Sequence, residues 1–299
     1  MNQSKRTDSS NLTLILGGSG FLGRSLARAL DGTGEYVGTS RTDSVESFAK
    51  FDITEEGSLR GLLARRNFST VVNLIGSTSN QSRRGLSSRE RMSLFSQFTD
   101  CEDLLISRTR IIHVGSGAEY GSATPPLSEG SAPMNLSEYG DGKLEETKFF
   151  SGLANHGLEV LVLRPSIVFG ASQKGDMLVP SVVRSLKEGR DPNLREPMRV
   201  RDFLYEKDFA SAVIRALNID WESGQVLNLG SGSPVRVQEF VEELSRMIGL
   251  KSDTENNKDS PRRDLDLTPE MDISLIRKEL GWEPRFDFKS AIADLVRTL

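Results

Sequence analysis

The sequence is poor in the side chains that bind metals and form disulfides. Among its 299 residues there is one cysteine, Cys101, and there are two histidines, His113 and His156. A single cysteine cannot close an internal disulfide, so we expect a reducing compartment and a cytoplasmic protein. Neither histidine has a partner at the spacing of a metal site, and we therefore predict that no metal is bound.

Long apolar runs and an excess of positive charge are also missing. No stretch approaches the roughly 20 apolar residues that a membrane-spanning helix needs, and residues 1–10 are polar, without the apolar segment of a signal peptide. The formal net charge is −4, which gives no reason to expect a nucleic acid as partner. The composition, with 36% hydrophobic and 27% charged residues, is typical of a globular protein with a sizeable core.

Short apolar runs alternate with helical patterns through the first half of the chain. Repeated β-α-β units of this kind indicate an α/β fold with a doubly wound, Rossmann-like parallel sheet. The predicted strands are residues 12–16, 36–40, 48–53, 70–75, 111–114 and 158–163, and the predicted helices are residues 21–30, 55–66, 89–107 and 139–155.

The alternation becomes less regular after residue 166. A strand is predicted at residues 226–229, and helices are predicted at 237–248, 273–280 and 288–296. We assign residues 11–166 and about 200–235 to a dinucleotide-binding domain, and residues 167–199 and 236–299 to a smaller carboxyl-terminal substrate lobe.

A glycine-rich turn follows the first predicted strand, where residues 17–23 read GGSGFLG. Glycines at Gly17, Gly20 and Gly23 allow a tight turn and let backbone N–H groups approach a pyrophosphate at the start of a helix. Because the turn joins an apolar strand to an amphipathic helix, it predicts a bound dinucleotide.

The end of the second predicted strand bears on the choice of dinucleotide. NAD-binding folds usually place a carboxylate there, roughly 20 residues after the glycines, to hold the ribose hydroxyls. This chain has Ser40 and Arg41 instead, and the first carboxylate is Asp43. An arginine can pair with a 2′-phosphate, so NADP(H) is favoured, with NAD(H) as the alternative.

Three side chains are candidates for proton transfer. Tyr139 and Lys143 lie four residues apart in a predicted helix and therefore share one face. A phenol with a pKa near ~10 exchanges protons poorly at neutral pH, and a neighbouring ammonium lowers that pKa. Ser116 follows the strand at 111–114 and is expected at the carboxyl edge of the sheet, where its hydroxyl could donate to a carbonyl oxygen.

In this order, the motifs resemble those of the extended short-chain dehydrogenase/reductases, and specifically of the NAD-dependent epimerase/dehydratase group that acts on nucleotide sugars. The resemblance covers nearly the whole chain. It implies that Ser116, Tyr139 and Lys143 are the catalytic residues. It also implies a set of cofactor contacts, namely Gly17, Ser19, Gly20, Phe21, Leu22, Gly23, Ser40, Arg41, Asp52, Ile53, Leu74, Ile75, Gly76, Tyr139, Lys143 and Pro165.

The second half of the chain carries further motifs of this group. They are LRPSIVFG at residues 163–170, VRDFLY at 200–205, NLGSG at 228–232, RRD at 262–264 and LGWEP at 280–284. In the group, arginines at two of these positions hold the nucleotide diphosphate, which implies that Arg201 and either Arg262 or Arg263 bind the substrate together with Ser116. Guanidinium groups suit phosphate oxygens because they donate paired hydrogen bonds.

Three departures from the group's pattern are informative. The usual asparagine of the LRxxNVYG segment is replaced by Ile167 in this chain. The asparagine that the group carries on the helix before the Ser116 strand aligns best with Gln97. The 4,6-dehydratases carry an acidic pair directly after their catalytic threonine, where this chain has Gly117 and Ala118. The missing acids disfavour a dehydratase.

These features together predict an NADP(H)-dependent oxidoreductase that reduces a nucleotide-linked 4-keto-6-deoxyhexose. One alternative is a nucleotide-sugar 4-epimerase with tightly bound cofactor, and a more distant one is a non-catalytic NADP-binding protein of the same fold. Neither a nucleic acid nor a membrane is an expected partner. The resemblance implies a homodimer formed through the helices predicted at residues 89–107 and 139–155.

Overall fold

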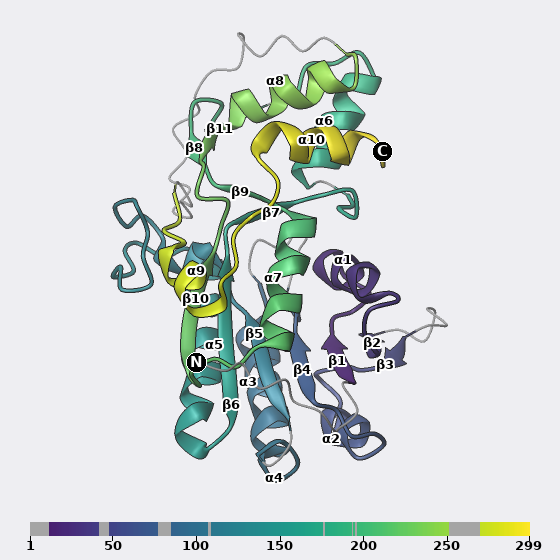
Figure 1. Cartoon of the computed structure of the whole chain (residues 1–299), viewed down its shortest axis with the longest axis vertical. Coiled ribbons are helices and arrows are strands. Elements are labelled where there is room, and N and C mark those ends of the chain that lie inside the picture. Colours follow the sequence, from purple (N-terminus) through teal and green to yellow (C-terminus); the bar gives the residue numbers. More distant parts are fainter. Residues whose placement is uncertain are drawn as a thin grey trace.

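The computed structural model describes residues 12–41, 48–76, 85–106, 109–175, 177–192, 194, 196–250 and 270–299. Its centre is a seven-stranded parallel sheet with the strand order β10-β6-β5-β4-β1-β2-β3 (Figure 1). The strands are β1 (Thr13–Leu16), β2 (Tyr36–Ser40), β3 (Ala49–Lys50), β4 (Thr70–Asn73), β5 (Arg110–Val114), β6 (Glu159–Pro165) and β10 (Gln225–Leu229). The predicted doubly wound α/β fold is confirmed.

Helices cover both faces of this sheet, which explains why its central strands are apolar throughout. Every residue of β1, β4 and β5 is buried, as expected for strands that pack on two sides. One face packs against α1 (Phe21–Leu30), α7 (Glu206–Asn218) and α9 (Ser274–Leu280). The other face packs against α2 (Ser58–Leu63), α3 (Ser88–Thr99), α4 (Glu102–Leu105) and α5 (Glu138–Gly152).

A third apolar cluster lies beyond the carboxyl end of β6 (Figure 1). It is formed by two short paired strands and three helices. These are β7 (Ile167–Phe169), β9 (Phe203–Tyr205), α6 (Leu178–Lys187), α8 (Val237–Met247) and α10 (Phe288–Val296). Another pair, β8 (Val200–Arg201) with β11 (Val235–Arg236), lies beside them. These elements are joined directly to the edge of the sheet where the predicted site residues gather.

The helix predicted at residues 89–107 is instead two helices, α3 and α4. The helical hydrogen bonding stops at Asp100, whose carbonyl oxygen accepts a hydrogen bond from Arg60 Nη1 at 2.7 Å. Cys101 then leaves helical geometry and is buried against the sheet. A side chain from α2, distant in sequence, thus binds the carbonyl end of α3 at the break.

Other predicted elements are shorter in the structure: the strand at 48–53 is only β3 (Ala49–Lys50), and the helix at 55–66 is only α2 (Ser58–Leu63). The strand predicted at 70–75 ends at Asn73, whose Oδ1 atom accepts a hydrogen bond from the Ile75 N–H at 3.2 Å. The helix predicted at 139–155 ends at Gly152, and a 3-10 turn, η3 (Leu153–His156), follows it. Among the helices that the structure describes, none has the length and apolar character needed to cross a bilayer.

Candidate active site

The glycine-rich turn joins β1 to α1 at the carboxyl edge of the sheet. Gly17 has a φ of 80°, a left-handed conformation that favours glycine. A Cβ atom on Gly23 would lie 2.3 Å from the Gly17 carbonyl oxygen and 2.6 Å from the Gly18 Cα atom. The turn therefore packs backbone directly against backbone, and no larger residue fits there.

The first turn of α1 is suited to a phosphate group. Its N-cap residue is Gly20, no side chain caps it, and its first turn carries no acidic residue. The N–H groups of a helix start carry partial positive charge and attract anions. Together with the close packing of Gly17 and Gly23, this arrangement fits the pyrophosphate of a dinucleotide.

The neighbouring strands β2 and β3 place the residues that we expect at the adenosine end. Arg41 follows β2 directly, and Asp52 lies two residues after β3. Hydrogen bonds from Thr54, first from its N–H and then from its hydroxyl, lower the pKa of Asp52, and the nearby Arg41 charge acts in the same direction. Asp52 therefore stays a carboxylate, available to accept hydrogen bonds.

Gln97 on α3 holds the same loop in place. Its side-chain amide donates to the Ile53 carbonyl oxygen at 3.2 Å and accepts from the Leu59 N–H at 2.9 Å. Gln97 is buried, so these bonds fix the loop after β3 from inside the protein. The position that departs from the group's asparagine thus supports the predicted adenosine site.

Lys143 reaches the carboxyl ends of β4 and β5 from α5. Its Nζ atom donates to the Val114 carbonyl oxygen at 3.3 Å and to Glu146 Oε2 at 2.7 Å. A Cβ atom on Gly76 would lie 3.4 Å from the same Nζ atom. Burial by itself lowers the pKa of Lys143, but the Glu146 carboxylate, with contributions from Tyr139 and Glu119, outweighs it and holds that pKa above its ordinary value.

Tyr139 lies one helical turn before Lys143, at the start of α5. The Ser137 hydroxyl caps this helix by accepting from the Gly140 N–H at 2.9 Å. The Tyr139 ring is half-buried, and a Cβ atom on Gly85 would lie 3.2 Å from its Cδ2 atom. The predicted face that presents Tyr139 and Lys143 together therefore lies over the carboxyl edge of the sheet.

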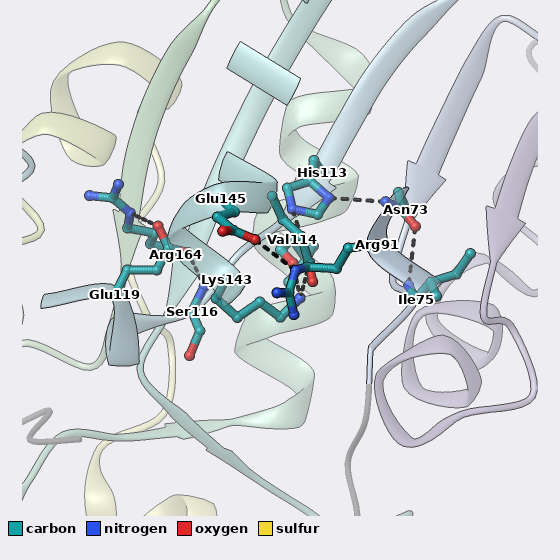
Figure 2. Close-up of polar contacts among 11 residues, drawn as sticks. Asn73, Ile75, Arg91, His113, Val114, Ser116, Glu119, Lys143, Glu145 and Arg164 are labelled. Carbon is teal, nitrogen blue, oxygen red and sulfur yellow. Dashed lines mark hydrogen bonds and ion pairs between the residues drawn. The ribbon is translucent and has the colours of Figure 1, made fainter. Parts of the chain in front are cut away.

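Ser116 follows β5 and begins the short turn η2 (Gly117–Tyr120). Its N–H donates to Glu119 Oε1 at 2.7 Å, and its hydroxyl accepts from the Ala118 N–H at 3.2 Å. Figure 2 shows Ser116 and Lys143 near one another, with Glu119 and Arg164 behind Ser116.

Glu119 and Arg164 form a buried ion pair, with Arg164 Nε donating to Glu119 Oε2 at 2.6 Å. Arg164 Nη1 also donates to the Tyr120 hydroxyl at 3.0 Å, which itself donates to Asn228 Oδ1 at 2.6 Å. Burial raises the pKa of Glu119, while Arg164 and the Ser116 N–H pull it down. Both Glu119 oxygens are engaged in holding the turn, so this carboxylate is not an available acid or base.

The predicted substrate arginines are only partly within the described residues. Arg201 lies in β8, and its Nη2 atom is 3.5 Å from Glu196 Oε2. Its neighbour Asp202 accepts hydrogen bonds from the Ser231 N–H at 2.7 Å and the Ser166 hydroxyl at 3.0 Å. This Asp202 cluster joins three of the motifs in the second half of the chain. Arg262 and Arg263 lie outside the described residues.

Sequence reasoning did not find four polar side chains behind the site, namely Asn73, His113, Glu119 and Glu146. Each lies in a buried strand, a tight turn or a charged helix, and therefore gives no pattern of its own. The one sequence feature that could have pointed to them is a polar side chain at a position where a buried strand or turn normally carries an apolar residue.

The fold and this edge of the sheet define a dinucleotide-dependent α/β enzyme. A sequence profile of the NAD dependent epimerase/dehydratase family matches residues 13–230. The chain belongs to this family and is an enzyme of the short-chain dehydrogenase/reductase type with a nicotinamide cofactor, as predicted.

Individual relatives span nearly the full chain. The chain is 28% identical to a dTDP-6-deoxy-L-talose 4-dehydrogenase (NAD(P)(+)) of Kitasatospora kifunensis, over 94% of this chain and 93% of the relative. It is 26% identical to a dTDP-glucose 4,6-dehydratase of an Actinoplanes species, over 95% and 96% of the two chains. The solved structure of a Thermotoga maritima UDP-glucose 4-epimerase with UDP-glucose has the same fold, with a TM-score of 0.82, 21% identity, and coverage of 96% and 98%.

Proposed function

We propose that this protein is an NADP(H)-dependent reductase of a nucleotide-linked 4-keto-6-deoxyhexose. The observation that carries the proposal is the Lys143 ammonium, buried between Gly76 and Val114 and one turn from Tyr139. A relative that is a 4-dehydrogenase of a dTDP-linked 6-deoxyhexose supports this substrate class, because dehydrogenation at C4 is the reverse of ketone reduction.

Tyr139, Ser116 and Lys143 have separate roles in the proposed reduction. A bound nicotinamide would supply the hydride that reduces the ketone carbon. Tyr139 would give its proton to the forming alkoxide, and the Ser116 hydroxyl would donate a hydrogen bond to the same oxygen. Lys143 stabilises the resulting phenolate because its charge lies next to the Tyr139 ring.

A dehydratase is disfavoured on structural as well as sequence grounds. Gly117 and Ala118 supply no acid or base, and the neighbouring Glu119 has both carboxylate oxygens engaged by Ser116 and Arg164. No described carboxylate in the turn after β5 is therefore available to remove a proton from the sugar.

The preference for NADP(H) rests on Arg41. It follows β2, where an NAD-preferring site usually has a carboxylate, and its guanidinium could pair with a 2′-phosphate. On the substrate side, we propose that Arg201 and Arg262 or Arg263 hold the nucleotide diphosphate.

We also propose a homodimer through α3 and α5. The two helices already pack against each other, with the Phe95 and Phe149 rings stacked 4.1 Å apart and Arg91 Nε 2.8 Å from Glu145 Oε2. Met92 on α3 is 66% exposed, and a second copy would cover it. Sedimentation of the purified protein at the mass of one chain would contradict this proposal.

The decisive test is turnover of a panel of UDP-, dTDP- and GDP-linked 4-keto-6-deoxyhexoses with NADPH. We expect stoichiometric oxidation of NADPH, and we expect Tyr139→Phe to lower kcat by about 10²- to 10⁴-fold, because the proton donor is lost. Tyr36→Phe is the control. Tyr36 lies at the amino end of β2, away from the carboxyl ends of the strands, and its hydroxyl bonds only Asp31 among the described contacts. Near-normal turnover by Tyr139→Phe would refute the mechanism.

The same assay separates the alternatives. A 4-epimerase would copurify with its cofactor and interconvert C4 epimers without net NADPH oxidation. Tight NADPH binding without turnover of any panel member would support a non-catalytic dinucleotide-binding protein.

A further inference from the structure

A cluster of buried polar side chains adjoins Lys143 near the ends of β4 and β5, and Figure 2 labels three of its members, Asn73, His113 and Lys143. Its members come from β4, β5 and α5 and are Asn73, His113, Lys143 and Glu146. Their exposed fractions are 0%, 0%, 5% and 1%. Buried polar groups are costly unless they are paired, so these four side chains are expected to depend on one another.

The hydrogen bonds of the cluster have a defined direction. The Ile75 N–H can only donate, and it bonds Asn73 Oδ1 at 3.2 Å. The Asn73 amide nitrogen therefore faces His113 Nδ1, 3.0 Å away, and donates to it. His113 must then carry its proton on Nε2, the ring nitrogen that lies 3.8 Å from Glu146 Oε2.

The His113 ring is fixed in this orientation by packing. It stacks on the Phe150 ring at 4.1 Å with an angle of 15° between the planes. Burial, and then the Lys143 charge, hold the pKa of His113 well below its ordinary value, so the ring stays neutral. The Nε2–H of this neutral imidazole therefore lies toward Glu146 Oε2, at a distance longer than a hydrogen bond.

Glu146 is also in direct contact with the catalytic lysine. Its Oε2 atom accepts from Lys143 Nζ at 2.7 Å, and the two residues are three apart on α5. The other charged or titratable groups around Lys143 are Tyr139 on its own helix, His113 on β5 and Glu119 in the turn after β5. Among the described residues that follow β4, the uncharged Gly76 lies next to it, with a Cβ atom there 3.4 Å from Lys143 Nζ.

We propose that Glu146 is a positioning residue for Lys143, holding its ammonium charged and directed between the ends of β4 and β5, with the His113 ring, which Asn73 and Phe150 fix in place, packed behind Glu146. This inference rests on the proposed function, in which Lys143 assists Tyr139. The inference adds Glu146, His113 and Asn73, as supporting residues, to the proposed catalytic set of Ser116, Tyr139 and Lys143. These three residues lie near the ends of β4 and β5, beside the proposed nicotinamide site.

Replacing Glu146 by glutamine removes the negative charge and keeps the size of the side chain. The Lys143 ammonium then loses its proton at a lower pH, because the Glu146 carboxylate had been opposing that loss. Reduction by the proposed mechanism requires a charged Lys143. We therefore expect the alkaline limb of kcat for Glu146→Gln to move down by about one pH unit or more, with a smaller change in the KM of the sugar.

Glu145→Gln is the matched control, because it makes the same charge change one residue earlier on the same helix. Glu145 is half exposed and pairs with Arg91 rather than with Lys143. We expect its pH profile to coincide with that of the wild type. Coincidence of the Glu146→Gln and Glu145→Gln profiles would overturn the inference.

A binding measurement separates failure of this inference from failure of the proposed function. If the wild type turns over no sugar of the panel, the proposed function fails, and NADPH affinity is then measured against pH by nicotinamide fluorescence. As the pH is raised, the proposed role predicts that Glu146→Gln loses NADPH affinity at a lower pH than Glu145→Gln does, because Lys143 must be charged to hold the cofactor as proposed. Equal pH dependence in the two variants would overturn the role of Glu146.

Stability provides a readout for the case in which Glu146→Gln folds poorly. Lys143→Met and Glu146→Gln each leave one partner of the buried pair alone, whereas the double variant removes both charges. We expect the double variant to unfold at a higher urea concentration than the two single changes predict when added together. Strict additivity would show that Glu146 does not act through Lys143.

Discussion

His113 is completely buried, and its protonation is therefore coupled to folding. Its pKa in the folded protein is well below the ordinary value, first because of burial and then because of the Lys143 charge. In the unfolded chain a histidine titrates near ~6.5. Below that pH the unfolded chain takes up a proton that the folded protein does not, so the stability present above it is progressively lost as the pH falls.

This coupling predicts a pH-dependent free energy of unfolding. Between pH 6.5 and 5, His113 should contribute a slope approaching about 1.4 kcal/mol per pH unit, the limit for one proton. Urea titrations across this range should show a smaller slope for His113→Gln. His156→Gln is the control, since its side chain is 58% exposed. An unchanged slope in His113→Gln would contradict the coupling.

At the scale of single elements, the turn between β1 and α1 leaves no room for a larger side chain. A Cβ atom on Gly23 would meet only backbone atoms, the Gly17 oxygen and the Gly18 Cα, which cannot move aside as a flexible side chain can. By contrast, a Cβ atom on Gly61 in α2 would meet nothing within 4 Å. Both glycines lie in helices, but only Gly61 has room for a side chain.

We therefore predict opposite effects of the same substitution. Gly23→Ala should lower the free energy of unfolding by about 1–3 kcal/mol through overpacking and weaken NADPH binding at least tenfold. Gly61→Ala should raise the free energy of unfolding by about 0.5–1 kcal/mol, because alanine loses less entropy in a helix. Urea denaturation and fluorescence titration measure both, and equal effects of the two changes would refute the packing argument.

The elements also show how far local sequence patterns reach. Strand β5 and helix α8 lie close to their predicted residues, because continuous apolar runs and amphipathic periodicity reflect burial directly. The break between α3 and α4 was missed because the helical periodicity continues across it, whereas in the structure Cys101 leaves helical geometry there. Helix α6 was missed in the irregular stretch after residue 166, although its buried residues Val179, Val182, Val183 and Leu186 recur at helical spacing.

At the scale of the whole molecule, the sheet edge brings together groups from six strands. The adenosine end of the predicted cofactor site follows β2 and β3, the glycine turn follows β1, and Lys143, Ser116 and Pro165 lie at the ends of β4, β5 and β6. A ligand that spans this edge contacts many elements at once. Its binding should therefore stabilise the whole fold.

This arrangement predicts a cofactor-dependent shift in thermal unfolding. A ligand at 100 times its dissociation constant adds about 2.7 kcal/mol to the stability of the folded state. At equal concentrations, NADPH should raise the midpoint temperature more than NADH, and Arg41→Ala should reduce that difference. Arg66→Ala, which changes an exposed arginine before β4, should leave it intact. A larger shift with NADH than with NADPH would rule out the proposed preference.

The sequence by itself determined the fold class, the family and the three candidate catalytic residues. It could do so because glycine turns, alternating β-α patterns and the Tyr139–Lys143 spacing depend on residues that are close together in the chain. Only the tertiary structure placed Glu146, His113 and Asn73 behind Lys143, and Glu119 and Arg164 behind Ser116. These contacts join different strands and helices, and a buried charge can be recognised as part of a site only when the partner that neutralises it is in place.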